Sequence, residues 1–303
     1  MISEIRKIRT ILKSTPTIEG AGVHLKRVFG FNEVPLFDPF LLLDDFRSDN
    51  PEHYRKGFPW HPHRGIETIT YVLAGDVEHG DSLGNSGCIH PGDVQWMTAG
   101  SGIIHQEMPK GDQKGAMYGF QLWANLPSGQ KMMDPRYREV PRDTIPEVKL
   151  PDGTIIRIIA GEVAGAQGPV QDIVIDPEYF DVTIPAHSQF RHATRRDHTV
   201  FAYVIGGRSY FNSRKEASNS PDRGSGVAGI DPTSAIGDGT LVLFDSGDEV
   251  KVSTEAQSAR FLLISGKPIG EPVAWQGPIV MNTQEELRTA FEEYRQGTFV
   301  KSR

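Results

Sequence analysis

The sequence predicts an all-β protein made of two antiparallel β domains, and three observations support this prediction. Short runs of β-branched and aromatic residues recur along the 303-residue chain, with turn residues between them. The 32 glycines and 21 prolines supply those turns. The strand-then-turn pattern TYVLAGDV at 70–77 returns as AYVIGGRS at 202–209, which indicates a duplicated β domain.

The predicted strands fall into two groups along the chain. The first group comprises ETITYVLAG (67–75), DVQWMTAG (93–100) and AMYGFQLWANLP (116–127). The second group comprises TIIRIIAG (154–161), YFDVTIPA (179–186), VFAYVIGG (200–207), LVLFDSGD (241–248) and ARFLLISG (259–266). Strands of this length, bounded by Gly, Pro and Asp, are typical of a sandwich or barrel.

An irregular stretch separates the two groups. Residues 126–148 are rich in proline and charge and have little apolar periodicity, so we expect the domain boundary there. This predicts an N-terminal domain over residues 1–138 and a C-terminal domain over residues 139–303. Residues 212–239 are polar and rich in Gly and Ser, which predicts a long mobile loop inside the second domain.

One helix is predicted, at the end of the chain. In NTQEELRTAFEEYRQG, Thr283 is the expected N-cap and Glu286 completes a capping box. Leu287 and Phe291 share an apolar face, and Gly297 is a stop signal. An apolar face of this kind is expected to dock on a domain.

Composition limits the location and the class of partner. With 38% hydrophobic and 23% charged residues the chain resembles a soluble globular protein, and no apolar run approaches the ~20 residues of a membrane span. The N-terminus lacks the pattern of a signal peptide, so we expect a cytoplasmic protein. A net charge of −7 argues against direct nucleic-acid binding. The single cysteine, Cys88, excludes an internal disulfide and a thiolate-rich metal site.

Two pairs of side chains carry the chemistry. His61 and His63 lie two residues apart in FPWHPHRGIE, so an extended chain points both rings to one side and Pro62 to the other. His105 and Glu107 repeat this spacing in GSGIIHQEMP. On neighbouring strands, the two pairs would direct three imidazoles and one carboxylate at a common point.

This ligand set predicts a mononuclear metal site. Three neutral nitrogens and one oxygen suit Fe(II), Mn(II), Co(II), Ni(II) or Cu(II), and zinc remains an alternative. An octahedral ion held by four ligands keeps two open positions, which a substrate oxygen and dioxygen can occupy side by side. Spacing alone leaves Glu67 as an alternative carboxylate, because it shares the strand parity of His61 and His63.

Four segments together resemble the pirin family, a branch of the cupin superfamily. They are HPHRGIETITYVLAGDVEHGDS, GDVQWMTAGSGIIHQEMP, GFQLWANLP and GPIVMNTQEELRTAFEEYRQG. The resemblance implies a bicupin, with two stacked antiparallel β-barrel (jelly-roll) domains and a C-terminal helix. It also implies a metal only in the N-terminal domain, held by His61, His63, His105 and Glu107, with Fe(II) as the first candidate.

The resemblance further implies quercetin 2,3-dioxygenase activity on a small aromatic substrate with dioxygen. Glu107 would then act as general base, and Phe58, Trp60 and Trp123 are candidates to stack on a planar ligand. The alternative is an iron-dependent regulator that acts through a protein partner. A sugar-phosphate isomerase is weakly supported, because Arg64 is the only nearby basic residue of the motif.

Overall fold

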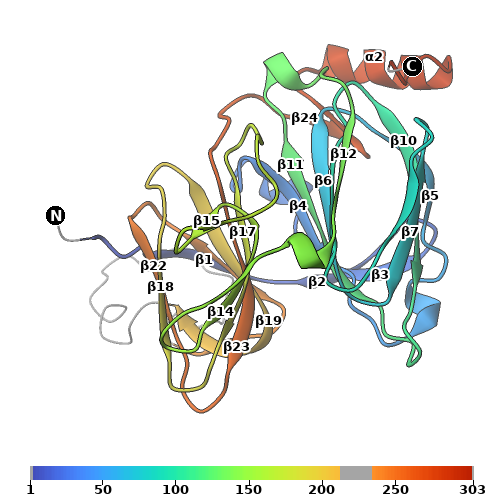
Figure 1. The fold of residues 1–303 in the computed structure, drawn as a ribbon. Coiled ribbons are helices and arrows are strands. Elements are labelled where there is room, and N and C mark those ends of the chain that lie inside the picture. The colour runs from blue at the N-terminus through green and yellow to red at the C-terminus, as the bar shows by residue number, and fades with distance from the viewer. Residues whose placement is uncertain (1–2, 212–233, 302–303) are drawn as a thin grey trace. The chain divides into compact units, whose positions relative to one another are not determined.

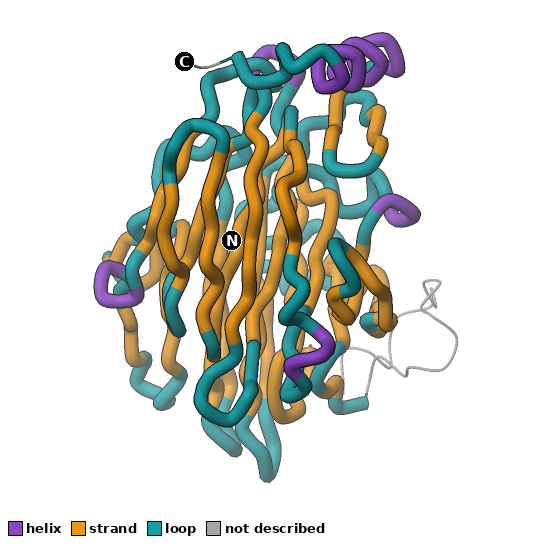
Figure 2. Tube along the Cα trace, turned by 90° about the vertical axis from the view of Figure 1, so that its right-hand side faces the viewer, coloured by secondary structure: helices purple, strands orange, loops and turns teal. Residues whose placement is uncertain are grey.

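The computed structural model describes residues 3–211 and 234–301, which form two compact units. The first β unit comprises residues 15–144 and 269–303, and the second comprises residues 1–14 and 145–268. Figure 2 shows that strands make up most of the fold. The predicted mostly-β architecture is therefore confirmed.

Two antiparallel sheets face each other in the first β unit (Figure 1). The larger sheet has the order β12-β9-β6-β11-β4-β3-β2. Its strands are β2 (Thr15–Glu19), β3 (Val23–Phe29), β4 (Phe40–Asp45), β6 (Ile66–Ala74), β9 (Val94–Thr98), β11 (Tyr118–Asn125) and β12 (Arg136–Val140). The smaller sheet, of order β5-β10-β7-β8, comprises β5 (Phe58–His63), β7 (Asp76–Asp81), β8 (Ser86–Ile89) and β10 (Ile103–Lys110).

The end of the chain completes the first β unit. Two short strands, β24 (Ala274–Gln276) and β25 (Ile279–Met281), form a hairpin. Helix α2 (Gln284–Arg295) follows and lies across one end of this unit (Figure 1). The predicted capping box is present, since the Thr283 hydroxyl accepts from the Glu286 amide at 3.2 Å and the Glu286 carboxylate accepts from the Thr283 amide at 2.9 Å. None of the described helices is long and apolar enough to cross a membrane.

A second antiparallel sheet system forms the second β unit. Its main order is β1-β21-β19-β23-β17-β14-β13. These strands are β1 (Ile8–Lys13), β13 (Glu147–Lys149), β14 (Ile155–Ala160), β17 (Glu178–Ile184), β19 (Thr199–Phe211), β21 (Thr240–Phe244) and β23 (Ala259–Gly266). The remaining strands are β15 (Glu162–Val163), β16 (Ala166–Gln167), β18 (Gln189–Ala193), β20 (Ile236–Gly237) and β22 (Glu249–Ser253).

The compact units differ from the predicted domains at both chain ends. The sequence predicts a single division, at residue 138. In the structure, residues 1–14 join the unit that holds residues 145–268, and residues 269–303 join the unit that holds residues 15–144. Residues 1–14 belong to the second unit because β1 pairs with β21. As a boundary between functional domains, residue 138 stays a prediction.

Most of the predicted loop at 212–239 lies outside the described residues. Its last part does not behave as a loop, because β20 pairs with β19 and Ile236 is buried. Regular strand structure therefore begins again at Ile236, inside the segment that its polar composition predicted to be a loop.

Candidate metal centre

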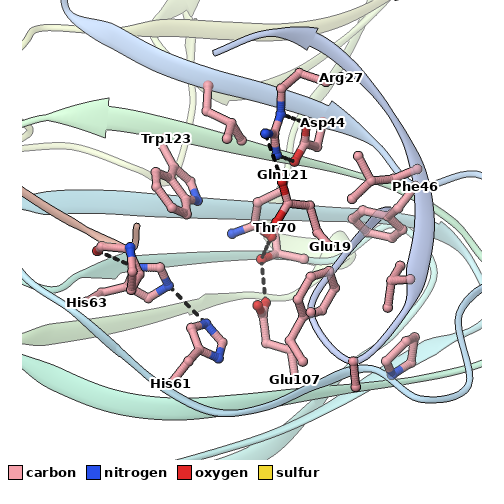
Figure 3. A pocket seen from close by; sticks show the side chains of 18 of the residues that line it. Glu19, Arg27, Asp44, Phe46, His61, His63, Thr70, Glu107, Gln121 and Trp123 are labelled. Atoms are coloured by element: carbon pink, nitrogen blue, oxygen red, sulfur yellow. Dashed lines mark hydrogen bonds and ion pairs between the residues drawn. The ribbon is translucent and has the colours of Figure 1, made fainter. Parts of the chain in front are cut away.

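Three histidine side chains converge on the inner face of the smaller sheet. His61 and His63 come from β5, and His105 comes from β10, where it lies directly opposite His61. Nε2 of His61 lies 3.0 Å from Nε2 of His63 and 3.0 Å from Nε2 of His105. Figure 3 shows His61 and His63 side by side at one end of the pocket. The three imidazoles expected to converge therefore meet.

Main-chain carbonyl groups orient two of these rings. Nδ1 of His61 lies 2.9 Å from the carbonyl oxygen of Pro59, and Nδ1 of His63 lies 3.0 Å from that of Pro278. Because a carbonyl only accepts hydrogen bonds, each Nδ1 carries the proton and each Nε2 keeps its lone pair. Two lone pairs thus face each other at 3.0 Å, an arrangement that a shared cation stabilises.

Burial keeps the three rings neutral. His105 is fully buried and His63 is 2% exposed. Desolvation lowers the pKa of His61, and it lowers the pKa values of His63 and His105 well below the usual range. Nδ1 of His105 lies 3.4 Å from the Tyr137 hydroxyl, the third partner behind the cluster. Neutral imidazole is the form that binds a metal.

The spacing of the ring nitrogens fits a single divalent ion. Metal–nitrogen bonds of about 2.0–2.1 Å place two ligand nitrogens about 2.9 Å apart at a right angle and about 3.4 Å apart at a tetrahedral angle. The two observed separations of 3.0 Å are closer to the right-angled case. All three nitrogens lie within 4.8 Å of one another. His61, His63 and His105 therefore form a candidate metal site with three nitrogen ligands.

Glu107 lies beside this cluster and is hydrogen bonded elsewhere. Its side chain lines the same pocket, and Oε1 accepts from the Thr70 hydroxyl at 3.1 Å (Figure 3). Burial raises the pKa of Glu107 to about 7, against a smaller opposite effect of the Thr70 hydrogen bond. In the described part of the chain the cluster of mutually close ligand atoms contains the three histidines without Glu107. A carboxyl with this pKa can accept and return a proton near neutral pH.

Glu67 lies away from the pocket. It is buried on β6, and its Oε1 accepts from the Thr98 hydroxyl at 2.6 Å. It is absent from the described residues that line the pocket. The strand parity that left Glu67 open as a ligand does not bring it to the histidines. Glu67 lies three residues before Thr70 on β6, so the two side chains point to opposite faces of the sheet, and Thr70 is the one that lines the pocket.

A β-bulge in β5 separates two aromatic residues, Phe58 and Trp60, that were both expected to contact the ligand. His105 pairs with His61 and Glu107 pairs with Phe58, so β5 carries one extra residue between these pairs. The extra residue turns Phe58 to the side of the histidines, where it lines the pocket. Trp60 is 53% exposed and does not line the pocket, in contrast with the ligand contact expected for it.

The pocket above the histidines has a volume of about 740 Å³, a size that accommodates a small organic ligand. A series of rings runs from the metal site along one wall. The Trp123 ring lies 5.1 Å from that of His63 and 5.9 Å from that of Trp275, and Phe31 lies 5.6 Å further on. Trp123 was expected here, whereas Trp275 comes from the distant β24 and gave no signal in the sequence.

Other clusters of potential ligands are weaker. Asp76, Cys88 and His90 also lie close together, but His90 and Asp76 already form an exposed ion pair at 2.8 Å. In the second β unit, His192 pairs with Glu178 at 3.1 Å. Within the described residues of that unit no group of three potential ligands comes together.

Comparisons with known proteins agree on one family. The chain matches the Pirin family over residues 22–124 and the Pirin C-terminal cupin domain over residues 179–300. It is 42% identical to a pirin-like protein of Caulobacter vibrioides, over 97% of this chain and 99% of the relative. It is 37% identical to a Pseudomonas aeruginosa protein named "Putative quercetin 2,3-dioxygenase", over 98% of this chain and 99% of that one.

A solved structure gives the same picture of the fold. The crystal structure of a quercetin 2,3-dioxygenase from Acinetobacter baumannii superposes with a TM-score of 0.84 at 29% sequence identity. The match covers 97% of this chain and 98% of that one. The similarity therefore extends through both β units of the chain.

Proposed function

The chain belongs to the pirin family, and from this premise we propose that it is a metal-dependent dioxygenase that opens the ring of a flavonol or a similar aromatic enol. The proposal rests on the convergence of His61, His63 and His105 at one end of a pocket of about 740 Å³. The names of two relatives, from Pseudomonas aeruginosa and Acinetobacter baumannii, support the same substrate class.

The three histidines and Glu107 hold one divalent metal in this proposal. Fe(II) is the first candidate, and Mn, Co, Ni, Cu or Zn are alternatives, because neutral imidazoles with one carboxylate suit each of them. The bound metal supplies a Lewis acid and a position at which dioxygen is activated. Oε1 of Glu107 accepts from the Thr70 hydroxyl at 3.1 Å, and its second carboxylate oxygen is the atom that would bind the metal.

Glu107 is the general base of the proposed reaction. The enol hydroxyl of the substrate must lose its proton before the ring is attacked, and a carboxylate whose pKa lies at about 7 is suited to take it. Thr70 holds the carboxylate in place through its hydroxyl. In the overall reaction both atoms of dioxygen enter the products, the ring opens and carbon monoxide leaves.

The walls of the pocket favour a flat, largely apolar ligand. Phe58 lies 6.4 Å from the His61 ring and Trp123 lies 5.1 Å from the His63 ring, and both line the pocket, where they can pack against the faces or edges of aromatic rings. Trp275 extends the same wall beyond Trp123, at 5.9 Å between the two rings.

The first experiment is dioxygen uptake with quercetin, using protein loaded with Fe(II) under nitrogen. We expect oxygen consumption with release of carbon monoxide, and neither in His61→Ala. If the metal site fills and quercetin is left unchanged, the dioxygenase proposal fails. The alternative, an iron-dependent regulator that acts through a protein partner, would then be tested by capture of partners in the two iron oxidation states.

The Glu107→Gln variant distinguishes the role of Glu107 as general base from its role in holding the metal. The variant keeps a side-chain oxygen that can accept from Thr70 but cannot take up a proton at neutral pH. We expect metal content close to one ion per chain and a loss of turnover of roughly 100-fold or more, the usual contribution of a general base. Turnover at the wild-type rate would remove Glu107 from the mechanism.

A further inference from the structure

A row of polar side chains crosses the inner face of the larger sheet, opposite the histidines. Arg27 on β3 pairs in register with Asp44 on β4, Asp44 with Gln121 on β11, and Gln121 with Thr70 on β6. All four side chains line the pocket. Figure 3 shows Arg27 and Asp44 at the far end of the row from His61 and His63.

The far end of this row is a charged cluster. Nε and Nη2 of Arg27 donate to the two oxygens of Asp44 at 2.9 and 2.8 Å, and Nη1 lies 2.9 Å from Glu19. The Asp44 side chain is 7% exposed, whereas that of Glu19 is 42% exposed. Both acids border the pocket. We call Glu19, Arg27 and Asp44 the distal cluster.

The distal cluster offers more acceptors than donors to a ligand. One guanidinium faces two carboxylates, so the cluster carries one net negative charge when all three groups are ionised. Among the described contacts each Asp44 oxygen accepts one N–H from Arg27, which leaves a further lone-pair direction on each oxygen. Such a surface favours hydroxyl groups, which donate hydrogen bonds, and disfavours a carboxylate or phosphate, which would face like charge.

The distance between the two ends of the pocket sets the length of the ligand. Thr70, whose hydroxyl bonds Glu107, and Asp44 are separated by two strand spacings, about 10 Å. A ligand with its enol oxygen at the histidines therefore needs a second ring to reach the distal cluster. The aromatic wall of Trp123 and Trp275 accompanies this path.

We propose that the distal cluster is a subsite that binds the hydroxyl groups of the second, pendant ring of a planar polyphenol. This inference rests on the proposed function for the position of the enol, and it narrows the substrate to polyphenols with hydroxyls on that ring. Glu19 and Asp44 accept the hydroxyl hydrogens, and Arg27 holds both carboxylates in position.

Two flavonols that differ only at the pendant ring test the subsite. Quercetin carries two adjacent hydroxyls there and galangin carries none, whereas their fused rings are the same. Isothermal titration calorimetry under nitrogen, with metal bound, measures affinity without turnover. We expect quercetin to bind at least about 10-fold more tightly than galangin, which corresponds to about 1.4 kcal/mol. Equal affinities, or no binding of quercetin, would overturn the subsite.

Substitutions in the distal cluster test whether it causes the preference for quercetin over galangin. Asp44→Asn and Glu19→Gln should each reduce the preference for quercetin to less than about 3-fold, with galangin affinity unchanged. Asp45→Asn is the matched control, because Asp45 is the next residue on β4, is 1% exposed, bonds Arg47 at 2.8 and 2.6 Å and does not line the pocket. The control should keep the full preference. An equal loss of affinity for both flavonols would indicate a structural role and refute the subsite.

Glu19→Gln keeps the test informative if the buried Asp44 variant fails to fold, since Glu19 is partly exposed. The two proposals also fail separately. If quercetin binds selectively but no oxygen is consumed, the subsite proposal stands and the dioxygenase proposal fails. If oxygen is consumed but both flavonols bind with equal affinity, the dioxygenase proposal stands and the subsite proposal fails.

Discussion

At the scale of single residues, the histidines are organised for a metal by atoms outside the cluster. The carbonyl oxygens of Pro59 and Pro278 fix the protonated nitrogen of His61 and His63, so the Nε2 lone pairs are directed inward by the fold itself. The ion does not have to arrange its own ligands. Removing one ligand should therefore abolish binding without disturbing the sheet.

The first prediction concerns those ligands. His61→Ala and His105→Ala should each lose stoichiometric metal. Each variant keeps only two histidine nitrogens and the Glu107 carboxylate, which also accepts a hydrogen bond from Thr70, and these are too few ligands to hold the ion. Metal analysis by mass spectrometry after gel filtration measures the loss, and far-UV circular dichroism should stay at the wild-type spectrum. Full metal content in both variants would contradict the assignment of the site.

A second prediction uses the pKa of Glu107 in metal-free protein. Its folded-state pKa of about 7 lies above the ordinary value of 4.5, so the folded state holds this proton more tightly than the unfolded state does. The resulting stability is present below pH 4.5 and is lost as the pH rises to about 7, with an upper bound of about 3 kcal/mol. Urea unfolding should show wild type losing stability relative to Glu107→Gln over this range. Parallel pH curves would contradict it.

Local sequence could predict the histidines because their i, i+2 spacing survives in any extended strand. It could not predict the orientation of Phe58 and Trp60, because the bulge in β5 depends on pairing with β10. Arg27 and Asp44 gave no signal either. They meet only through the register of β3 with β4, which sequence periodicity leaves open.

At the scale of elements, the C-terminal segment supports the metal strand. Arg64, directly after the histidine pair, is 2% exposed and bonds Glu293 at 2.7 Å and the carbonyl of Phe299 at 2.8 Å. Its guanidinium also lies over the Phe299 ring at 4.2 Å. Gly65 has a φ of +76°, and a Cβ there would collide with the carbonyl oxygen of Val280. Helix α2 and β25 are thus attached next to His63.

The third prediction follows from this attachment. Arg64→Leu should increase hydrogen exchange in α2 and weaken metal binding by roughly 10- to 100-fold, the usual effect of disturbing a group behind a ligand. Arg295→Leu is the control, because Arg295 is a 68% exposed residue of the same helix. Unchanged metal affinity in Arg64→Leu would show that α2 plays no part in positioning His63.

The helix itself could be predicted from Thr283, Glu286 and the apolar positions that follow, since a capping box and a helical period are local patterns. Its docking site could not, because Leu287 and Ala290 identify a buried face without identifying what covers it. For the same reason, local sequence could not predict that residues 1–14 and 269–303 each join the unit formed by the more distant part of the chain. Strand pairing between β1 and β21 joins residues more than 200 positions apart in the chain.

At the scale of the whole molecule, each unit has its own buried anchoring contacts, and the candidate metal site lies within the first unit. The histidines, Glu107 and Trp275 all belong to that unit. In the second unit, Arg6 is 1% exposed and donates to the Thr194 hydroxyl at 2.7 Å and to the carbonyl oxygens of Asp245 and Arg195 at 2.8 and 2.5 Å. The chain segment before β1 is tied to the second unit by these bonds.

The last prediction tests whether the metal depends on the second unit. Arg6→Met leaves three oxygens without their charged donor, which should destabilise that unit by about 2–4 kcal/mol. Hydrogen exchange should rise in β1, β18 and β21, whereas exchange in β5 and β10 and the metal content should match those of the wild type. Arg9→Met is the control, because Arg9 is an exposed arginine three residues later in the chain, on β1. Metal loss in Arg6→Met alone would mean that the site requires an intact second unit, and the proposed chemistry would then belong to both units together.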